Sequence, residues 1–89
     1  MLDIIIVNYN TTDHLIHCLA SLYEALDGAD ANIFVQDNAS ADHAETAKIR
    51  FPEIVLTENQ QNIGFSRAVN NALEQGEAER SEEHTSELQ

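Results

Sequence analysis

The sequence has few basic residues, and this shortage limits what the protein can bind. Four lysines and arginines stand against 16 aspartates and glutamates, which gives a formal net charge of -12. A surface that binds nucleic acid or an anionic membrane needs clustered positive charge. We therefore expect no nucleic-acid partner. A small anion can still be bound through backbone N–H groups at a helix N-terminus or through a divalent metal.

Cysteine and long apolar segments are also scarce. Cys18 is the only cysteine, so no internal disulfide and no cysteine-cluster metal site can form, and we expect a reducing, cytoplasmic location. Cys18 has apolar neighbours, which predicts a small core residue. The apolar segment at residues 2–7 is short and contains Asp3, so it is neither a signal peptide nor a membrane span.

Glycine is absent from the turn where one class of nucleotide-binding protein needs it. A dinucleotide-binding domain carries G-x-G-x-x-G directly after its first strand, and here the corresponding residues read N-Y-N-T-T-D. That absence excludes the class. A phospho-accepting receiver domain has an acidic pair at the same place, where this chain has amides, so that alternative is disfavoured.

Apolar segments of two kinds alternate along the chain. Short segments rich in β-branched residues predict strands at residues 2–7, 32–36 and 53–57. Apolar residues at three- and four-residue steps predict helices over residues 11–26, from Ser40 or Asp42 to about Arg50, and from about Gly64 to Gly76. With right-handed crossovers these elements form half of a doubly wound α/β sheet, and 89 residues form one domain at most.

The last ten residues differ from the rest of the chain. The segment "RSEEHTSELQ" at residues 80–89 has no apolar periodicity, and it matches the in-frame translation of a common short-read sequencing adapter. We expect residues 80–89 to be a disordered tail that is not native to the protein, and residues 1–79 to be its own sequence.

Polar residues follow each predicted strand, at residues 8–10, 37–40 and 59–62. In open parallel sheets, ligands bind beyond the carboxyl ends of the strands, where these residues converge. An aromatic ring, a single carboxylate and several amides fit a nucleobase and its ribose. Tyr9 can stack on the base, and Asp37 can accept a hydrogen bond from a pyrimidine N–H.

Each of these residues also has a structural interpretation. Tyr9 can pack at the end of its strand, Asp37 can close an Asx turn or cap the next helix, and Arg67 can lie on a solvated helix face instead of reaching a phosphate or ribose. His14 and His17 lie three positions apart, and without a third ligand they indicate surface histidines more than a metal site.

Three blocks of the sequence resemble a known family: "IIIVNYNTTDHLIHCLASL", "VQDNASAD" and "NQQNIGFSRAVNNAL". In order and separation they are similar to the opening of glycosyltransferase family 2, the nucleotide-sugar transferases with the GT-A fold. The N-Y-N and D-N-A-S forms especially resemble bacterial rhamnosyltransferase-like members. The resemblance implies the N-terminal half of a GT-A, Rossmann-like α/β domain, with three parallel strands in the order 3-2-1 and alternating helices.

The resemblance also implies roles for individual residues. Tyr9 would lie against the base, and Asp37 would bind the imide N–H of the base. The other positions implied to line the nucleotide-sugar pocket are Val7, Asn8, Asn10, Gly64, Arg67 and Asn70. The family usually has Thr-Asp-Gly after D-N-A-S, whereas this chain has Ala41-Asp42-His43. We therefore expect the turn into the second helix to differ.

The implied activity belongs to a longer parent protein, of which residues 1–79 would be the nucleotide-binding part. That parent would be an inverting glycosyltransferase acting on a uridine or thymidine diphosphate sugar and a glycan or lipid-linked acceptor. It would serve bacterial cell-surface polysaccharide synthesis, in the cytoplasm or at the inner face of the membrane. Its Mg or Mn site and its catalytic base would follow this segment, so we expect no catalytic residue here and an inactive fragment. The alternative is a non-catalytic nucleotide-binding or regulatory module.

Overall fold

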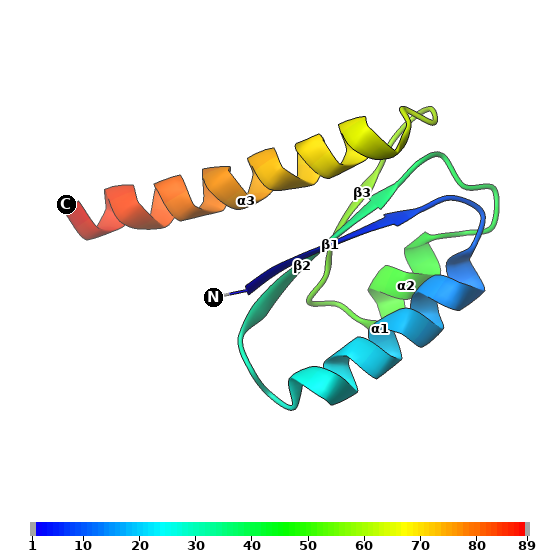
Figure 1. Cartoon of the computed structure of the whole chain (residues 1–89), viewed down its shortest axis with the longest axis horizontal. Coiled ribbons are helices and arrows are strands. Elements are labelled where there is room, and N and C mark those ends of the chain that lie inside the picture. Colours follow the sequence, from blue (N-terminus) through cyan, green and yellow to red (C-terminus); the bar gives the residue numbers. More distant parts are fainter. Residues whose placement is uncertain (1, 89) are drawn as a thin grey trace.

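The structure, a computed structural model, describes the backbone of residues 2–88 and the side chains of residues 2–79. Strands and helices alternate along the chain, as the sequence predicts (Figure 1). The elements are β1 (Leu2–Asn8), α1 (Thr12–Leu26), β2 (Ala31–Asp37), α2 (Glu45–Arg50), β3 (Val55–Glu58) and α3 (Phe65–Leu88).

The three strands form one parallel sheet in the order β1-β2-β3. This is the predicted order 3-2-1, seen from the other side. Ile5 pairs with Phe34, and Phe34 pairs in turn with Val55. Helices α1 and α2 cover one face of the sheet and α3 covers the other (Figure 1). Because the strands are parallel, their carboxyl ends lie at the same end of the sheet.

The core lies between the sheet and α1 and α2. Alternate residues of β2 supply its sheet side, because successive side chains of a strand point to opposite faces. The buried members of this core are Leu15, Leu19, Ile33, Val35, Ala47 and Ile54. Phe34 is buried on the opposite face, toward α3, whose small residues Ala68 and Ala72 are buried as well. Small side chains at these two positions let the helix lie close to the strands.

Two predictions are wrong, one about a core side chain and one about the start of a helix. Cys18 is exposed and is not a core residue. It lies one position before Leu19, and because each residue of a helix is rotated by about 100° from the one before it, Cys18 lies outside the buried stripe. Helix α2 begins at Glu45 after Ala44, which makes no side-chain cap bond. Neither Ser40 nor Asp42 therefore caps α2, because both side chains bond elsewhere.

Helix α3 extends past the predicted end at Gly76. It continues to Leu88, and Gly76 is absent from the glycines with a positive φ angle. Glycine within a helix costs about 1 kcal/mol but does not end it, and the residues that follow include good helix formers and no proline. Helix α3 thus includes the backbone of residues 80–88. Their side chains lie outside the described residues, and the non-native, disordered tail stays a prediction.

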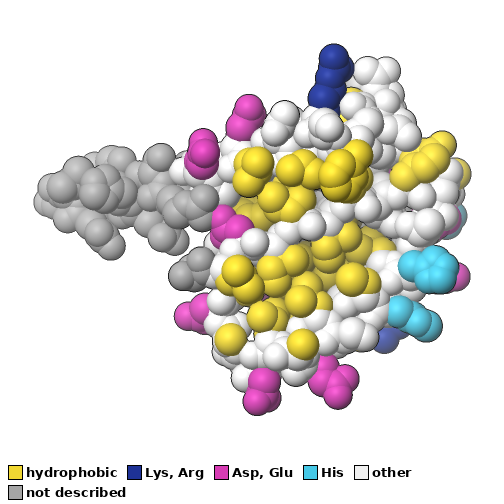
Figure 2. Space-filling model, viewed as in Figure 1, with side chains coloured by type: hydrophobic (Ala, Val, Ile, Leu, Met, Phe, Trp, Pro, Cys, Tyr) yellow, Lys and Arg dark blue, Asp and Glu magenta, His cyan; other side chains and the backbone are white. Residues whose placement is uncertain are grey.

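The outer edge of β1 has no partner among the described strands, since β1 pairs only with β2. Residues 4–7 are half-buried, whereas residues 33–35 of β2 are buried. Figure 2 shows apolar side chains gathered in two areas on this side of the molecule, one over α3 and one over the sheet and α1. Leu2, Phe65 and Leu73 are large exposed apolar residues. Helices thus cover both faces of the sheet, whereas the outer edge of strand β1 has no neighbouring strand among the described residues.

Candidate functional site

The carboxyl ends of the three strands and the start of α3 are joined by hydrogen bonds. The backbone N–H of Asn38 donates to the carbonyl oxygen of Asn8 at 2.9 Å, and that of Asn59 donates to the carbonyl oxygen of Asp37 at 2.8 Å. The side-chain amide of Asn38 also donates to the carbonyl oxygen of Gly64 at 3.4 Å. The segments that the sequence places after separate strands therefore form one continuous surface.

Asp37 lies at the centre of a buried polar cluster. Its carboxylate is 2% exposed, and Asn8 is 1% exposed. Oδ1 of Asp37 accepts hydrogen bonds from Asn8 Nδ2 at 2.9 Å and from Ser40 Oγ at 2.5 Å, while Oδ2 accepts from the Ser40 N–H at 3.0 Å. A buried carboxylate is stable only with such donors. Asp37 thus closes a turn with its side chain, as its structural interpretation predicts, and no oxygen is left without a partner.

Tyr9 lies beside this cluster, in a turn that is fixed on both sides. The preceding residue, Asn8, accepts a hydrogen bond from Thr11 Oγ1 at 2.8 Å. The following residue, Asn10, donates its N–H to Ser40 Oγ and accepts from the Ala41 N–H, both at 2.8 Å. The Tyr9 side chain itself is 51% exposed. About half of Tyr9 is therefore accessible, so the residue is only partly packed at the strand end.

The backbone at this edge adopts left-handed conformations at residues other than glycine. Asn10, Ala39 and His43 have φ angles of 51°, 62° and 61°. Each such residue costs about 1 to 2 kcal/mol, less for asparagine, and strained residues of this kind gather at functional sites. His43 stands at the position where the resemblance given above implies glycine. The hydrogen bonds around Asp37 and Ser40 hold this edge in its strained form.

Asp42 caps α1 from across the site. The Thr12 N–H donates to Asp42 Oδ2 at 2.9 Å and Thr12 Oγ1 donates to Oδ1 at 2.6 Å. The hydrogen bond from the Thr12 hydroxyl, and then that from its N–H, lowers the pKa of Asp42 below its ordinary value of 3.8. Thr11 occupies the N-cap position of α1 but makes no side-chain cap bond. A cap supplied from 30 residues away has no signature in the local sequence.

A second polar network, which the sequence analysis missed, ties α3 to the sheet. Gln36 is fully buried, accepts from Asn59 Nδ2 at 3.1 Å and donates to Gln75 Oε1 at 3.3 Å. Gln75 in turn donates to Thr57 Oγ1 at 2.7 Å, and Asn59 Nδ2 also donates to Asn38 Oδ1 at 3.0 Å. The available signal was a glutamine within the apolar run I-F-V-Q of β2.

The remaining candidate residues lie outside the hydrogen-bonded cluster around Asp37. Val7 is half-buried on β1, next to Asn8. Gly64 has a φ angle of 83° and is held through its carbonyl oxygen and its N–H, which donates to Asn62 Oδ1 at 2.8 Å. Arg67 and Asn70 are exposed in the first two turns of α3. Within the described side chains, no hydrogen bond joins Arg67 or Asn70 to the cluster around Asp37.

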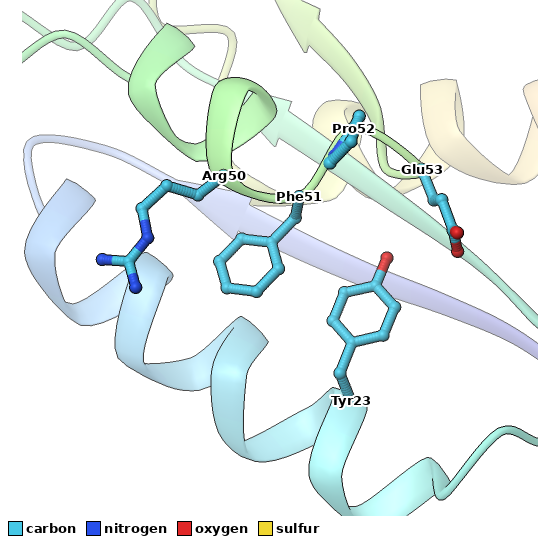
Figure 3. A pocket seen from close by; sticks show the side chains of 5 residues that line it. All are labelled: Tyr23, Arg50, Phe51, Pro52 and Glu53. Carbon is cyan, nitrogen blue, oxygen red and sulfur yellow. The ribbon is translucent and has the colours of Figure 1, made fainter.

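An open cavity of about 310 Å³ lies near the amino ends of the strands, at the other end of the sheet from Tyr9 (Figure 3). Tyr23 and Phe51 stack there with ring centroids 5.5 Å apart and planes inclined by 6°, and Arg50 lies 5.9 Å from the Phe51 ring centroid. Burial, and then the charge of Glu53, raises the pKa of Tyr23. The lining comes from the end of α1 and the segment after α2, away from the turn that carries Tyr9.

The described residues contain no group of three or more histidine, cysteine or acidic side chains that could hold a metal ion. His14 and His17 are both exposed on α1. Among the helices of the described part, none is long and apolar enough to cross a membrane.

Comparison with known proteins identifies the family. The family model for glycosyl transferase family 2 matches residues 3–79, which is most of the chain. The chain belongs to this family. No curated protein and no solved structure matches it. The three parallel strands and intervening helices of this glycosyltransferase chain are consistent with the N-terminal part of a GT-A, Rossmann-like fold, so the resemblance and the fold prediction are confirmed. The rhamnosyltransferase-like subtype stays a prediction.

Proposed function

We propose that the parent protein is an inverting glycosyltransferase whose uridine or thymidine diphosphate sugar lies across the carboxyl edge of this sheet. The observation that carries the proposal is the exposed ring of Tyr9 between two residues, Asn8 and Asn10, that are fixed by hydrogen bonds. An aromatic ring carried on a backbone turn that hydrogen bonds hold on both sides suits a pyrimidine base, because the turn need not be ordered when the base stacks on the ring.

The diphosphate of the donor needs a positive partner in a strongly acidic chain. Lys48 donates to the carbonyl oxygens of Pro52 and Ile54, and Arg50 lies over Phe51, both at the opposite edge. Arg67 is the exposed cation near the start of α3. In the proposed complex Arg67 faces the ribose or the phosphates, and Asn70, Gly64 and Val7 border them.

Members of this family commonly use a divalent metal, which would stabilise the departing diphosphate. The residues present here do not fit that role. The described residues hold no group of three or more histidine, cysteine or acidic side chains suited to a metal, and two of the carboxylates at this end, those of Asp37 and Asp42, already accept hydrogen bonds from Asn8, Ser40 and Thr12. We propose that the Mg or Mn ligands and the base that deprotonates the acceptor hydroxyl come from the parent beyond residue 79. No step of the reaction is assigned to a metal in this segment.

The acceptor proposed for the parent is a glycan or lipid-linked hydroxyl in bacterial cell-surface polysaccharide synthesis, at the cytoplasmic side of the membrane. The family membership supports a sugar transferase. The segment by itself is proposed to be inactive. The alternative, a non-catalytic nucleotide-binding module, would share the Tyr9 surface. An assay of the purified chain with nucleotide sugars and Mn²⁺ should show no metal-dependent turnover, and turnover would contradict the proposed division of roles.

The direct test is titration of the 89-residue chain with uridine and thymidine diphosphates by calorimetry. We expect saturable binding that Tyr9→Ala weakens by about 1 to 3 kcal/mol, the usual contribution of a base stacked on an aromatic ring. Tyr9→Phe is the matched control, since it keeps the ring and should bind nearly as well as the original chain. Equal affinity of the alanine variant would contradict the placement of the base on Tyr9.

A further inference from the structure

We propose that Asn59 is a positioning residue for the nucleotide site, because it fixes the start of α3, and with it Arg67, relative to the end of β2. The inference rests on the proposed function, in which Arg67 faces the ribose or the phosphates of the donor. Asn59 acts through Asn38, and neither residue is among those that the family resemblance places at the pocket. The basis is the second polar network, which joins β2, the loop after β3 and α3.

The first step is that Arg67 depends on the position of its helix. Arg67 is exposed, and among the described side chains no hydrogen bond joins it to the cluster around Asp37. An arginine on a helix surface can meet a bound donor in one direction only if the helix is fixed relative to the base, since otherwise the helix must be ordered on binding. The attachment of α3 to the end of β2 is therefore part of what the site needs.

The second step is the donor capacity of the Asn59 side chain. Its amide nitrogen carries two hydrogens, and both are used: Nδ2 donates to Gln36 Oε1 at 3.1 Å and to Asn38 Oδ1 at 3.0 Å. Gln36 is 0% exposed and Asn38 is 2% exposed. Among the described residues, Asn59 is the donor to both of these oxygens. Because a buried amide oxygen without a donor costs free energy, Asn59 holds both amides in one orientation.

The third step is the contact that Asn38 makes in this orientation. Its Nδ2 donates to the carbonyl oxygen of Gly64 at 3.4 Å. The same carbonyl oxygen accepts the Ala68 N–H at 3.2 Å, which is the bond that begins α3. Arg67 directly precedes Ala68 in this first turn. Without the Asn59 side chain, the Asn38 amide is free to rotate, and the start of α3 loses its bond to the end of β2.

A second attachment of α3 provides an internal comparison. Gln75 accepts a hydrogen bond from Gln36 Nε2 at 3.3 Å and donates to Thr57 Oγ1 at 2.7 Å. It lies about 16 Å farther along the helix than Gly64, at about 1.5 Å per residue. Both attachments hold α3 to the sheet, but only the one at Gly64 adjoins Arg67. Gln75 is therefore a matched control for stability within the same network.

Calorimetric titration of the 89-residue chain with uridine diphosphate tests the inference. We expect Asn59→Ala to lower the affinity about tenfold, the loss expected when one hydrogen bond to a charged group is no longer made. Gln75→Ala should destabilise the fold and leave the affinity of the folded protein unchanged. In an Arg67→Ala background, Asn59→Ala should have no further effect on affinity, because it acts through Arg67. If the alanine variant does not fold, Asn59→Ser keeps one donor and should give a smaller loss in the same direction.

Three results would overturn the inference. Unchanged affinity of Asn59→Ala would show that the start of α3 needs no support. A loss from Gln75→Ala as large as that from Asn59→Ala would show that the network serves stability alone. A loss from Asn59→Ala that persists in full in the Arg67→Ala background would show that Asn59 does not act through Arg67.

A readout without ligand separates this inference from the proposed function. Asn59→Ala should speed hydrogen exchange at the Ala68 amide, which bonds to the Gly64 carbonyl oxygen, more than Gln75→Ala does. If the original chain binds neither uridine nor thymidine diphosphate, the proposed function fails, while the exchange rates still decide whether Asn59 fixes the start of α3. Equal exchange rates at Ala68 in the two variants would refute the positioning role.

Discussion

The two ends of the sheet are held together in different ways. At the carboxyl end, bonds join side chains 29 and 30 positions apart, from Asn8 to Asp37 and from Thr12 to Asp42. At the amino end one side-chain hydrogen bond, from Asn32 Nδ2 to Asp3 Oδ1 at 3.3 Å, joins two strands, Lys48 donates to a carbonyl oxygen four positions along the chain, and the ring of Tyr23 stacks on that of Phe51.

The backbone differs between the two ends as well. Among the residues with a positive φ angle, Asn10, Ala39 and His43 lie at the carboxyl end. Asp27 and Gly28 lie at the amino end, where they close α1 in an ordinary left-handed cap. Strain without a capping role is thus confined to the end that carries the candidate site. This difference supports the proposal that the carboxyl end holds a ligand site, whereas the amino end contributes to stability.

Phe51→Ala should have the largest effect on stability. The substitution removes the stacked ring and part of the core packing, and because Phe51 is half-buried we expect a loss of about 2 to 3 kcal/mol, just below the range for a fully buried phenylalanine. Urea denaturation followed by circular dichroism measures it. Nucleotide affinity of the folded protein should stay unchanged. A loss of affinity as large as that of Tyr9→Ala would remove the distinction between the two ends.

Ala39→Gly should have a smaller effect of the opposite sign. Ala39 is exposed and has a φ angle of 62°, so glycine relieves left-handed strain of about 1 to 2 kcal/mol and loses part of this gain as backbone entropy. We expect a net gain in unfolding free energy of about 0.5 to 1 kcal/mol in the same denaturation experiment. Ala41→Gly is the matched control two positions along, where φ is not positive and glycine should destabilise. Equal effects of the two variants would show that the turn is not strained.

Asp42→Asn should have the smallest effect on stability, and the pH dependence of that effect tests whether Asp42 caps α1. Hydrogen bonds from Thr12 lower the pKa of Asp42 in the folded chain below 3.8, so the unfolded chain takes up the proton at a higher pH than the folded chain does. The stabilisation is therefore complete well above pH 3.8 and is lost as the pH falls through the folded pKa. The difference in melting temperature between the original chain and the variant should be constant near neutral pH and shrink below about pH 4. A difference that is independent of pH would contradict the cap.

Local sequence patterns predicted the order and type of every element, because each depends on contacts within a few residues. The β-branched run at residues 2–7 and the apolar steps through Leu15 and Leu19 favour a strand and a helix in any context where one face is covered. The end of α3 was predicted wrongly because glycine weakens a helix without ending it. The position of Cys18 was predicted wrongly because consecutive residues of a helix point in different directions, so a residue next to a core position need not face the core.

The candidate site was predicted in part. Polar residues after each strand placed Asn8, Tyr9 and Asp37 at one edge, since parallel strands must end together. The sequence alone could not show that Tyr9 is exposed beside the buried Asp37, because Tyr9 follows the last paired residue of β1, where the side chains have no fixed alternation. It also could not show that Asp42 caps α1, since the residue after a strand usually serves the next helix and not the previous one.

The fold class follows from the apolar periods along the sequence, and the resemblance of the three sequence blocks to a known family implies the family and the strand order. Only the tertiary structure decides which polar groups meet. Ser40 lies 30 positions from Asn10, and no local preference brings the hydroxyl of one to the backbone of the other. Pairing of β1 with β2 in the register Asn8 to Asp37 does so, since it places the two following loops side by side. Tyr9, which follows this pairing, is about half exposed, and this exposure is also a property of the tertiary structure.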